Sequence, residues 1–182
     1  MTTPVKVAVL AGSLRKDSHS TSVLRAALNR FAEDIDATWI DNLDRLPAFN
    51  EDHEAEPGAE VAKLREAVAG ADAVFAATPE YNGLLPGHLK TALDWVSRPY
   101  ANGVIKGKPA AGFGASPSPN GGLWAVESLH RAYTVAGAAV VGEPTPIAAS
   151  PEATDEAGAL AREEDAAKLD GLLRDLVAAA RS

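Results

Sequence analysis

Apolar and polar residues form alternating blocks along the chain, in which short apolar runs are separated by stretches of helical periodicity. The apolar runs at residues 5–11, 38–40, 73–77, 110–114 and 138–142 predict strands buried on both faces. Apolar residues recur at helical spacing over residues 21–31, 61–69, 86–96, 123–136 and 156–181. This alternation predicts a single α/β domain over residues 1–182, with a five-stranded parallel sheet between two helical layers.

Three strand-to-helix turns are unusually rich in glycine, proline and serine: residues 12–20, 79–86 and 115–122. A short chain with one phosphate-type turn after the first strand favours a flavodoxin-like three-layer sandwich with strand order 2-1-3-4-5. Ligands of such sheets bind at the carboxyl ends of the strands, where we expect the three turns to meet. Residues 41–57 form an irregular, acidic stretch, and an irregular stretch of that length is often functional or crosses over a site. Residues 144–151 are predicted to be extended.

The first turn follows a buried strand and opens a helix, so backbone N–H groups and the positive end of the helix dipole face it. The hydroxyls of Ser13, Ser18 and Ser20 and the Arg15 guanidinium suit the acceptor oxygens of a phosphate monoester. His19 either adds donors or is an ordinary solvated residue. Dinucleotide and Walker A patterns are absent, and a solvated turn with a serine N-cap remains the alternative interpretation.

The second turn combines an aromatic ring and an amide with unusual backbone: Pro79, Glu80, Tyr81, Asn82 and Gly83. Such a loop can lie flat against a planar ligand. Alternatively, the tyrosine only packs against the protein and the last two residues only form a turn.

The third turn contains small residues, among them Ser116, Gly121 and Gly122. Small residues let the backbone approach a ligand, and the helix start that follows can stabilise negative charge on a bound ring. A loose surface loop would have the same composition.

Two motifs resemble those of the NAD(P)H-dependent FMN reductases. They are Gly12-Ser13-Leu14-Arg15-x-x-Ser18 and Pro79-Glu80-Tyr81-Asn82-Gly83-x-x-Pro86-Gly87-x-Leu89-Lys90-x-Ala92-Leu93-Asp94-Trp95. The resemblance covers residues 5 to about 144 and implies an FMN phosphate in turn 13–20, the isoalloxazine against residues 79–82 and residues 116–122 beside the ring. The family commonly has asparagine at the positions of Ser20 and Thr91.

The function that the resemblance implies is that of an NAD(P)H-dependent flavin reductase. NADPH or NADH would pass a hydride to N5 of FMN, and a flavin, quinone or similar small-molecule acceptor would then take it in a ping-pong scheme, without a catalytic side chain. The alternative is a flavodoxin-type electron-transfer protein that binds FMN without direct NAD(P)H turnover. Arg15 and the Tyr81 loop favour the reductase, while the acceptor and the choice of nicotinamide stay open.

Composition excludes several other classes. A formal net charge of −8 disfavours nucleic-acid binding, and the absence of cysteine excludes disulfides and thiolate metal sites. The four histidines lack metal-site spacing, so we expect no metal, and no Gly-x-Ser-x-Gly hydrolase motif is present.

Location and assembly follow from other features of the chain. The first strand begins at Val5 without room for a signal peptide, and no apolar run is long enough to span a bilayer, so we expect no membrane partner and a cytoplasmic location. Helix 86–96 with Leu85, Leu89, Trp95 and nearby Tyr100 is rich in large apolar groups. Core packing explains them, but the resemblance favours a homodimer, or a homotetramer, with this helix at the interface.

Overall fold

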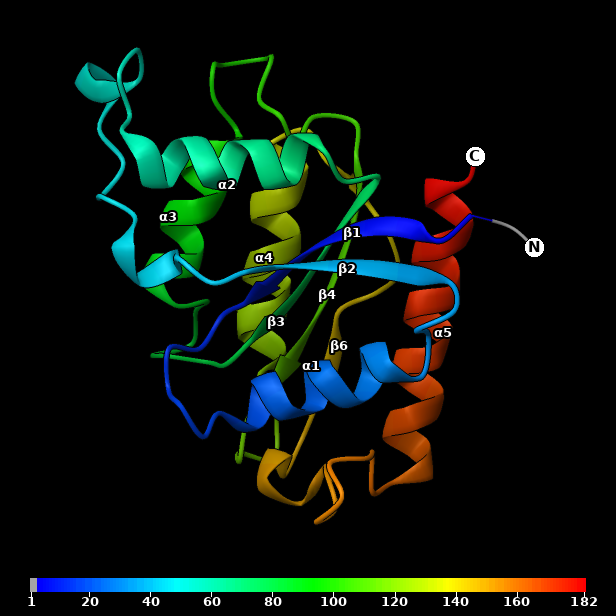
Figure 1. Ribbon diagram of the computed structural model, residues 1–182. Helices are drawn as coiled ribbons and strands as arrows, with labels where there is room; N and C mark the ends of the chain where they lie inside the picture. Colours follow the sequence, from blue (N-terminus) through cyan, green and yellow to red (C-terminus); the bar gives the residue numbers. More distant parts are fainter. Residues whose placement is uncertain (1–2) are drawn as a thin grey trace.

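A parallel sheet lies between two helical layers in the computed structural model, which describes residues 3–182 (Figure 1). The strands are β1 (Val5–Ala11), β2 (Ile35–Ile40), β3 (Ala73–Thr78), β4 (Pro109–Ala115), β5 (Ala139–Val140) and β6 (Thr145–Ile147). Their order is β2-β1-β3-β4-β5, with β6 also paired to β4, and every pairing is parallel. The flavodoxin-like order predicted from the sequence is confirmed.

The fifth position of the sheet is divided between two short strands. β5 pairs with Pro109 and Ala110 at the start of β4, whereas β6 pairs with residues 113–115 at its end. Between them the chain bends at Gly142, which has a φ of +76°. The predicted strand at residues 138–142 is therefore shorter than expected, and part of the extended stretch 144–151 completes the same position.

The helices are α1 (His19–Asn29), α2 (Ala59–Ala69), α3 (Gly87–Val96), α4 (Leu123–Val135) and α5 (Glu163–Ala180). α1 and α5 cover one face of the sheet, and α2, α3 and α4 cover the other (Figure 1). Within β1, Val7 and Val9 face the first layer while Ala8 and Leu10 face the second. Since successive side chains of a strand point to opposite faces, the continuous apolar run is buried on both sides.

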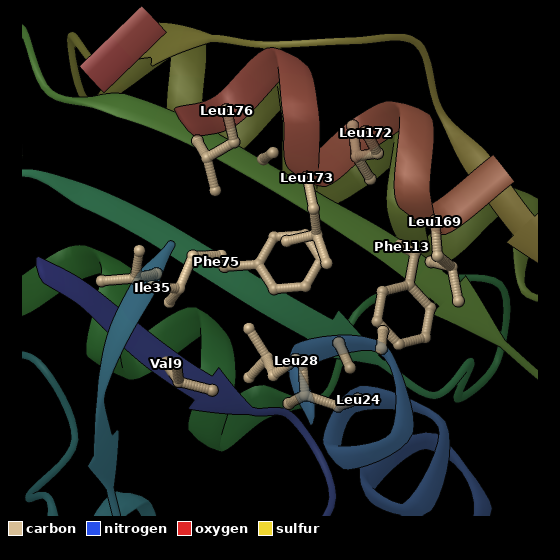
Figure 2. Packing of buried hydrophobic residues seen from close by; sticks show 14 of the residues in the cluster. Val9, Leu24, Leu28, Ile35, Phe75, Phe113, Leu169, Leu172, Leu173 and Leu176 are labelled. Atoms are coloured by element: carbon tan, nitrogen blue, oxygen red, sulfur yellow. The ribbon is translucent and has the colours of Figure 1, made fainter. Parts of the chain in front are cut away.

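The core beneath α1 and α5 is centred on two phenylalanines. The rings of Phe75 and Phe113 have centroids 5.9 Å apart and lie between leucines of α1 and α5, as Figure 2 shows. Because both rings stand on central strands, this packing fixes the carboxyl ends of β3 and β4 relative to α1.

The last helix begins later than its periodicity predicts, at Glu163 and not near Glu156. An antiparallel bridge between Thr154 and Leu160 and a φ of +80° at Gly158 hold the preceding residues in a turn. The helix then opens on three acidic residues, which its positive dipole end favours.

The irregular segment 41–57 contains two short 3-10 helices, η1 (Leu43–Arg45) and η2 (Glu51–His53), and packs on α3. Trp95 Nε1 donates a 2.8 Å hydrogen bond to the Pro47 carbonyl, and Phe49 meets the indole edge-on at 4.9 Å between ring centroids. Trp95 and Leu89 are thus fully buried within this chain. They belong to its core, as the packing interpretation of this helix expects, and whether α3 also lies at a subunit interface stays a prediction.

None of the helices described over residues 3–182 combines the length and the apolar character needed to cross a bilayer.

Candidate functional site

A cavity of about 130 Å³ lies where β1, β3 and β4 end, at the edge of the sheet where the strand order reverses. The structure brings nine of the predicted site residues to its wall: Ser13, Arg15, Ser18, His19, Ser20, Pro79, Glu80, Tyr81 and Ser116. Ala115 and Pro117 of the third turn also line it, and Ser150, which lies outside the three predicted turns, completes the lining. All three predicted turns therefore contribute to one cavity.

The first turn presents hydroxyls at the start of α1. Ser18 is the N-cap, and its Oγ accepts a 3.3 Å hydrogen bond from the Thr21 N–H and lies 3.0 Å from Ser20 Oγ. Both hydroxyls are buried, whereas Arg15 is exposed at the rim. This cap satisfies the Thr21 N–H, whereas the N–H groups of His19 and Ser20 have no acceptor within the helix and are available to an anion.

The backbone of this turn is held from behind by two contacts at Gly12. Its N–H donates to the Ala77 carbonyl at 2.8 Å, and a Cβ at this position would lie 2.6 Å from the same oxygen, so only glycine fits. Its carbonyl accepts from His88 Nε2 at 3.1 Å, a residue of α3 that sequence reasoning did not connect with the site. Burial lowers the pKa of His88, so the neutral tautomer with the proton on Nε2 makes this contact.

Glu80 links the second turn to the third. Asn120 Nδ2 donates to both of its carboxylate oxygens, at 3.1 and 3.3 Å, and the Ala125 N–H in the first turn of α4 donates at 3.3 Å. Asn120 Oδ1 in turn accepts from Ser118 Oγ and from the Gly122 N–H. One carboxylate thereby fixes the spacing of the two loops and caps α4.

Four predicted site residues lie outside the cavity wall: Asn82, Gly83, Gly121 and Gly122. Asn82 is exposed, with a φ of +53°. The N–H groups of Gly121 and Gly122 donate within their own loop, to the Ser118 carbonyl and to Asn120 Oδ1. Both glycines are needed because the backbone crowds them: a Cβ at Gly121 would lie 2.7 Å from the Ala148 nitrogen.

The cavity fits the phosphate end of a cofactor. Its volume of about 130 Å³ suits a small anionic group such as a phosphate. Its chemistry agrees, because serine hydroxyls, a guanidinium and a helix start are donors for an anion. Within residues 3–182, no three His, Asp or Glu side chains are grouped so as to hold a metal ion.

A donor-lined, phosphate-sized cavity at the switch point of a parallel sheet with this strand order defines a flavodoxin-like flavoprotein. Comparison with known proteins then assigns the particular family. Residues 5–152 match the family described as NADPH-dependent FMN reductase, and the chain belongs to that family.

Relatives of known type agree with this assignment. A quinone reductase of Pseudomonas putida is 43% identical over 126 residues, which are 69% of this chain and 67% of that enzyme. A 2-hydroxy-1,4-benzoquinone reductase of a Burkholderia species is 37% identical over 112 residues, or 62% of this chain and 61% of that enzyme. The structure of FerB from Paracoccus denitrificans, a flavoenzyme NAD(P)H:(acceptor) oxidoreductase, has a TM-score of 0.88 at 32% identity and covers 97% of both chains.

The chain is accordingly an oxidoreductase of the flavin reductase type, with FMN as cofactor and NAD(P)H as electron donor. The family favours this reductase over the flavodoxin-type electron carrier that the sequence left as an alternative.

Proposed function

We propose that residues 1–182 form one domain in which the cavity at the ends of β1, β3 and β4 holds the FMN phosphate. The observation that carries this proposal is the set of donors at one end of the cavity: the Ser13, Ser18 and Ser20 hydroxyls, the Arg15 guanidinium and the start of α1. The ring end of the cofactor extends toward the second and third turns, which Glu80 holds at a fixed spacing.

Bound FMN supplies the hydride chemistry, accepting a hydride from NAD(P)H and giving it to an acceptor. The residues of this chain would bind and orient the FMN. Ser18 and Ser20 would donate hydrogen bonds to the phosphate from a buried position, Arg15 would add positive charge at the rim, and His88 holds the Gly12 carbonyl by a hydrogen bond. No side chain is assigned as an acid or a base.

Titration of the flavin-free protein with FMN, followed by flavin fluorescence, tests this assignment. Arg15→Ala should weaken FMN binding by roughly 10-fold to 100-fold, the value of a hydrogen bond to a charged group. Lys16→Ala is the matched control, since it removes the same charge from the neighbouring exposed residue, which does not line the cavity. Equal effects of the two substitutions would show that only long-range charge matters and would refute the Arg15 contact.

The acceptor class that we propose is a quinone, because the relatives described above reduce quinones. Exposed rings beside the second turn agree with a planar acceptor: Tyr81 is 46% exposed and Trp124 is 59% exposed. If NAD(P)H and the quinone bind at the same place one after the other, double-reciprocal plots of initial rate against NAD(P)H concentration, measured at several quinone concentrations, give parallel lines. Anaerobic NADPH or NADH should bleach the flavin band, and added quinone should restore it.

We further propose that two copies of the chain assemble through the groove between α3 and α4. This groove of about 530 Å³ is mostly apolar, with Leu84, Leu85, Leu93 and Ala132 in its lining and Val135, 84% exposed, at its edge. Burying such a surface against a second copy removes apolar area from water. Light scattering should give the mass of a dimer, or of a tetramer, and Val135→Glu should lower it to that of a monomer.

A cytoplasmic location remains part of the proposal, supported by the use of NAD(P)H as electron donor in this family. Fractionation of producing cells tests it.

A further inference from the structure

A fourth segment of the chain, beyond the three turns, closes the cavity. It runs from the end of β6 into the 3-10 helix η3 (Ser150–Glu152). The Ser116 N–H donates to the Ile147 carbonyl at 3.2 Å, the Ser150 N–H donates to the Ser116 carbonyl at 3.1 Å, and the Ile147 N–H donates to the Gly121 carbonyl at 3.2 Å. These bonds fix the position of Ser150 against the third turn.

The hydroxyl of Ser150 is an exception among the serines of the cavity. The residue lines the cavity and is only 1% exposed, yet its Oγ has no hydrogen-bond partner within residues 3–182. Ser18 and Ser20 bond each other, and Ser116 Oγ lies 2.9 Å from Ser118 Oγ. A buried hydroxyl without a partner destabilises a protein, so its presence in the wall of a ligand cavity points to a partner that arrives with the ligand.

The backbone before Ser150 gives a second, independent indication. Ala149 has a φ of +45°, in the left-handed region that residues with a Cβ seldom adopt. Strained residues of this kind cluster at binding and active sites, where the surrounding contacts hold them. Here the strain turns the chain from β6 so that the next residue reaches the cavity wall.

We propose that Ser150 is a further cofactor-binding residue, whose hydroxyl donates a hydrogen bond to an oxygen of the phosphate–ribityl chain of FMN. Rotation about its Cα–Cβ bond, which has three staggered positions, is the movement that would aim the hydroxyl at a bound ligand. This inference rests on the proposed function, because it takes the cavity to be the FMN phosphate site.

Ser150→Ala tests the proposal through two measurements, the affinity for FMN and the stability of the flavin-free variant. The dissociation constant for FMN should rise by roughly 5-fold to 100-fold, as expected for the loss of one hydrogen bond to a neutral or a charged oxygen. The urea midpoint of the flavin-free variant should equal or exceed that of the wild type, because alanine removes a buried hydroxyl that had no partner. A hydroxyl with a purely structural role would instead lower the midpoint.

Riboflavin, which lacks the phosphate, identifies the oxygen that is contacted. A loss of affinity for FMN alone assigns the bond to the phosphate, and equal losses for FMN and riboflavin assign it to the ribityl chain. Thr145→Val is the matched control, since it removes a hydroxyl from β6 that donates to the Glu143 carbonyl outside the cavity.

An unchanged dissociation constant for both flavins, or a flavin-free Ser150→Ala variant with a lowered urea midpoint, overturns the role of Ser150. Failure of the wild-type protein to bind FMN at all would overturn the proposed function itself.

Discussion

Replacing Glu80 by alanine should destabilise the flavin-free protein, because within residues 3–182 its carboxylate is the one side-chain acceptor that joins the second turn to the third. Two donor groups lose their partner: Asn120 Nδ2, at 3.1 and 3.3 Å, and the Ala125 N–H, at 3.3 Å. A half-buried donor left without its acceptor costs about 1 kcal/mol, so the free energy of unfolding should fall by about 2 kcal/mol. For a chain of this size, that change lowers the melting temperature by about 4–8 °C.

Urea unfolding of the flavin-free protein, followed by tryptophan fluorescence, measures this loss. Glu80→Gln keeps one acceptor oxygen and should lose about half as much, or about 1 kcal/mol. Glu127→Ala is the control, because it removes an exposed carboxylate from α4. In the double variant Glu80→Ala with Asn120→Ala, the loss of unfolding free energy should be smaller than the sum of the two single losses. The difference, which measures the coupling of the two side chains, should be at least about 0.5 kcal/mol. A loss below about 0.5 kcal/mol in Glu80→Ala, within the range of an ordinary surface substitution, would refute the reasoning.

Three further predictions concern other parts of the molecule. Gly12→Ala forces a Cβ to within 2.6 Å of the Ala77 carbonyl oxygen, so it should cost about 1–3 kcal/mol of stability and also weaken FMN binding, both measurable by titration. Glu60 has its pKa lowered from 4.5 to about 2, first by the hydrogen bond from Asn42, so it stabilises the fold above pH 4.5. That contribution is lost as the pH falls toward 2, and Glu60→Gln should flatten the slope of stability over this range. Tyr133→Phe removes a fully buried hydroxyl without a partner in residues 3–182, so the variant should be as stable as the wild type or more stable, and a clear loss in urea would contradict this.

The strand order and the meeting of the three turns could be predicted because their signals are local. A continuous apolar run such as residues 73–77 and a turn such as Pro79–Gly83 are visible within a few residues, and the topology rules then leave few arrangements. The contacts that stabilise the site are not local. His88 is separated from Gly12 by 76 positions in the sequence, and Asn120 is separated from Glu80 by 40. Polar side chains such as these are also common on protein surfaces, so their residue types do not predict the contacts.

Two segments were harder still to interpret from their residues alone. Residues 156–162 include alanine and leucine at helical spacing, but Gly158 and the bridge from Thr154 to Leu160 hold them in a turn. Ser150 lies in a proline-rich extended stretch, and only the pairing of β6 with β4 brings it to the cavity. In the first case tertiary pairing overrides the local pattern, and in the second it gives an extended stretch a position that its own residues do not indicate.

The exposed indole of Trp124 gives this enzyme an optical reporter of its own cofactor. It is one of three tryptophans, and its ring edge lies 3.5 Å from the position that a Cβ on Gly83 would occupy, at the end of the second turn. Trp95, by contrast, is enclosed by α3 and the segment around Pro47. A flavin bound beside the second turn absorbs in the region where indoles emit, so excitation energy of Trp124 should pass to it without emission, and the tryptophan fluorescence should fall in proportion to occupancy. The chain can therefore be titrated with FMN without a label, and Trp124→Phe, at a position outside the cavity lining, should reduce the change in emission.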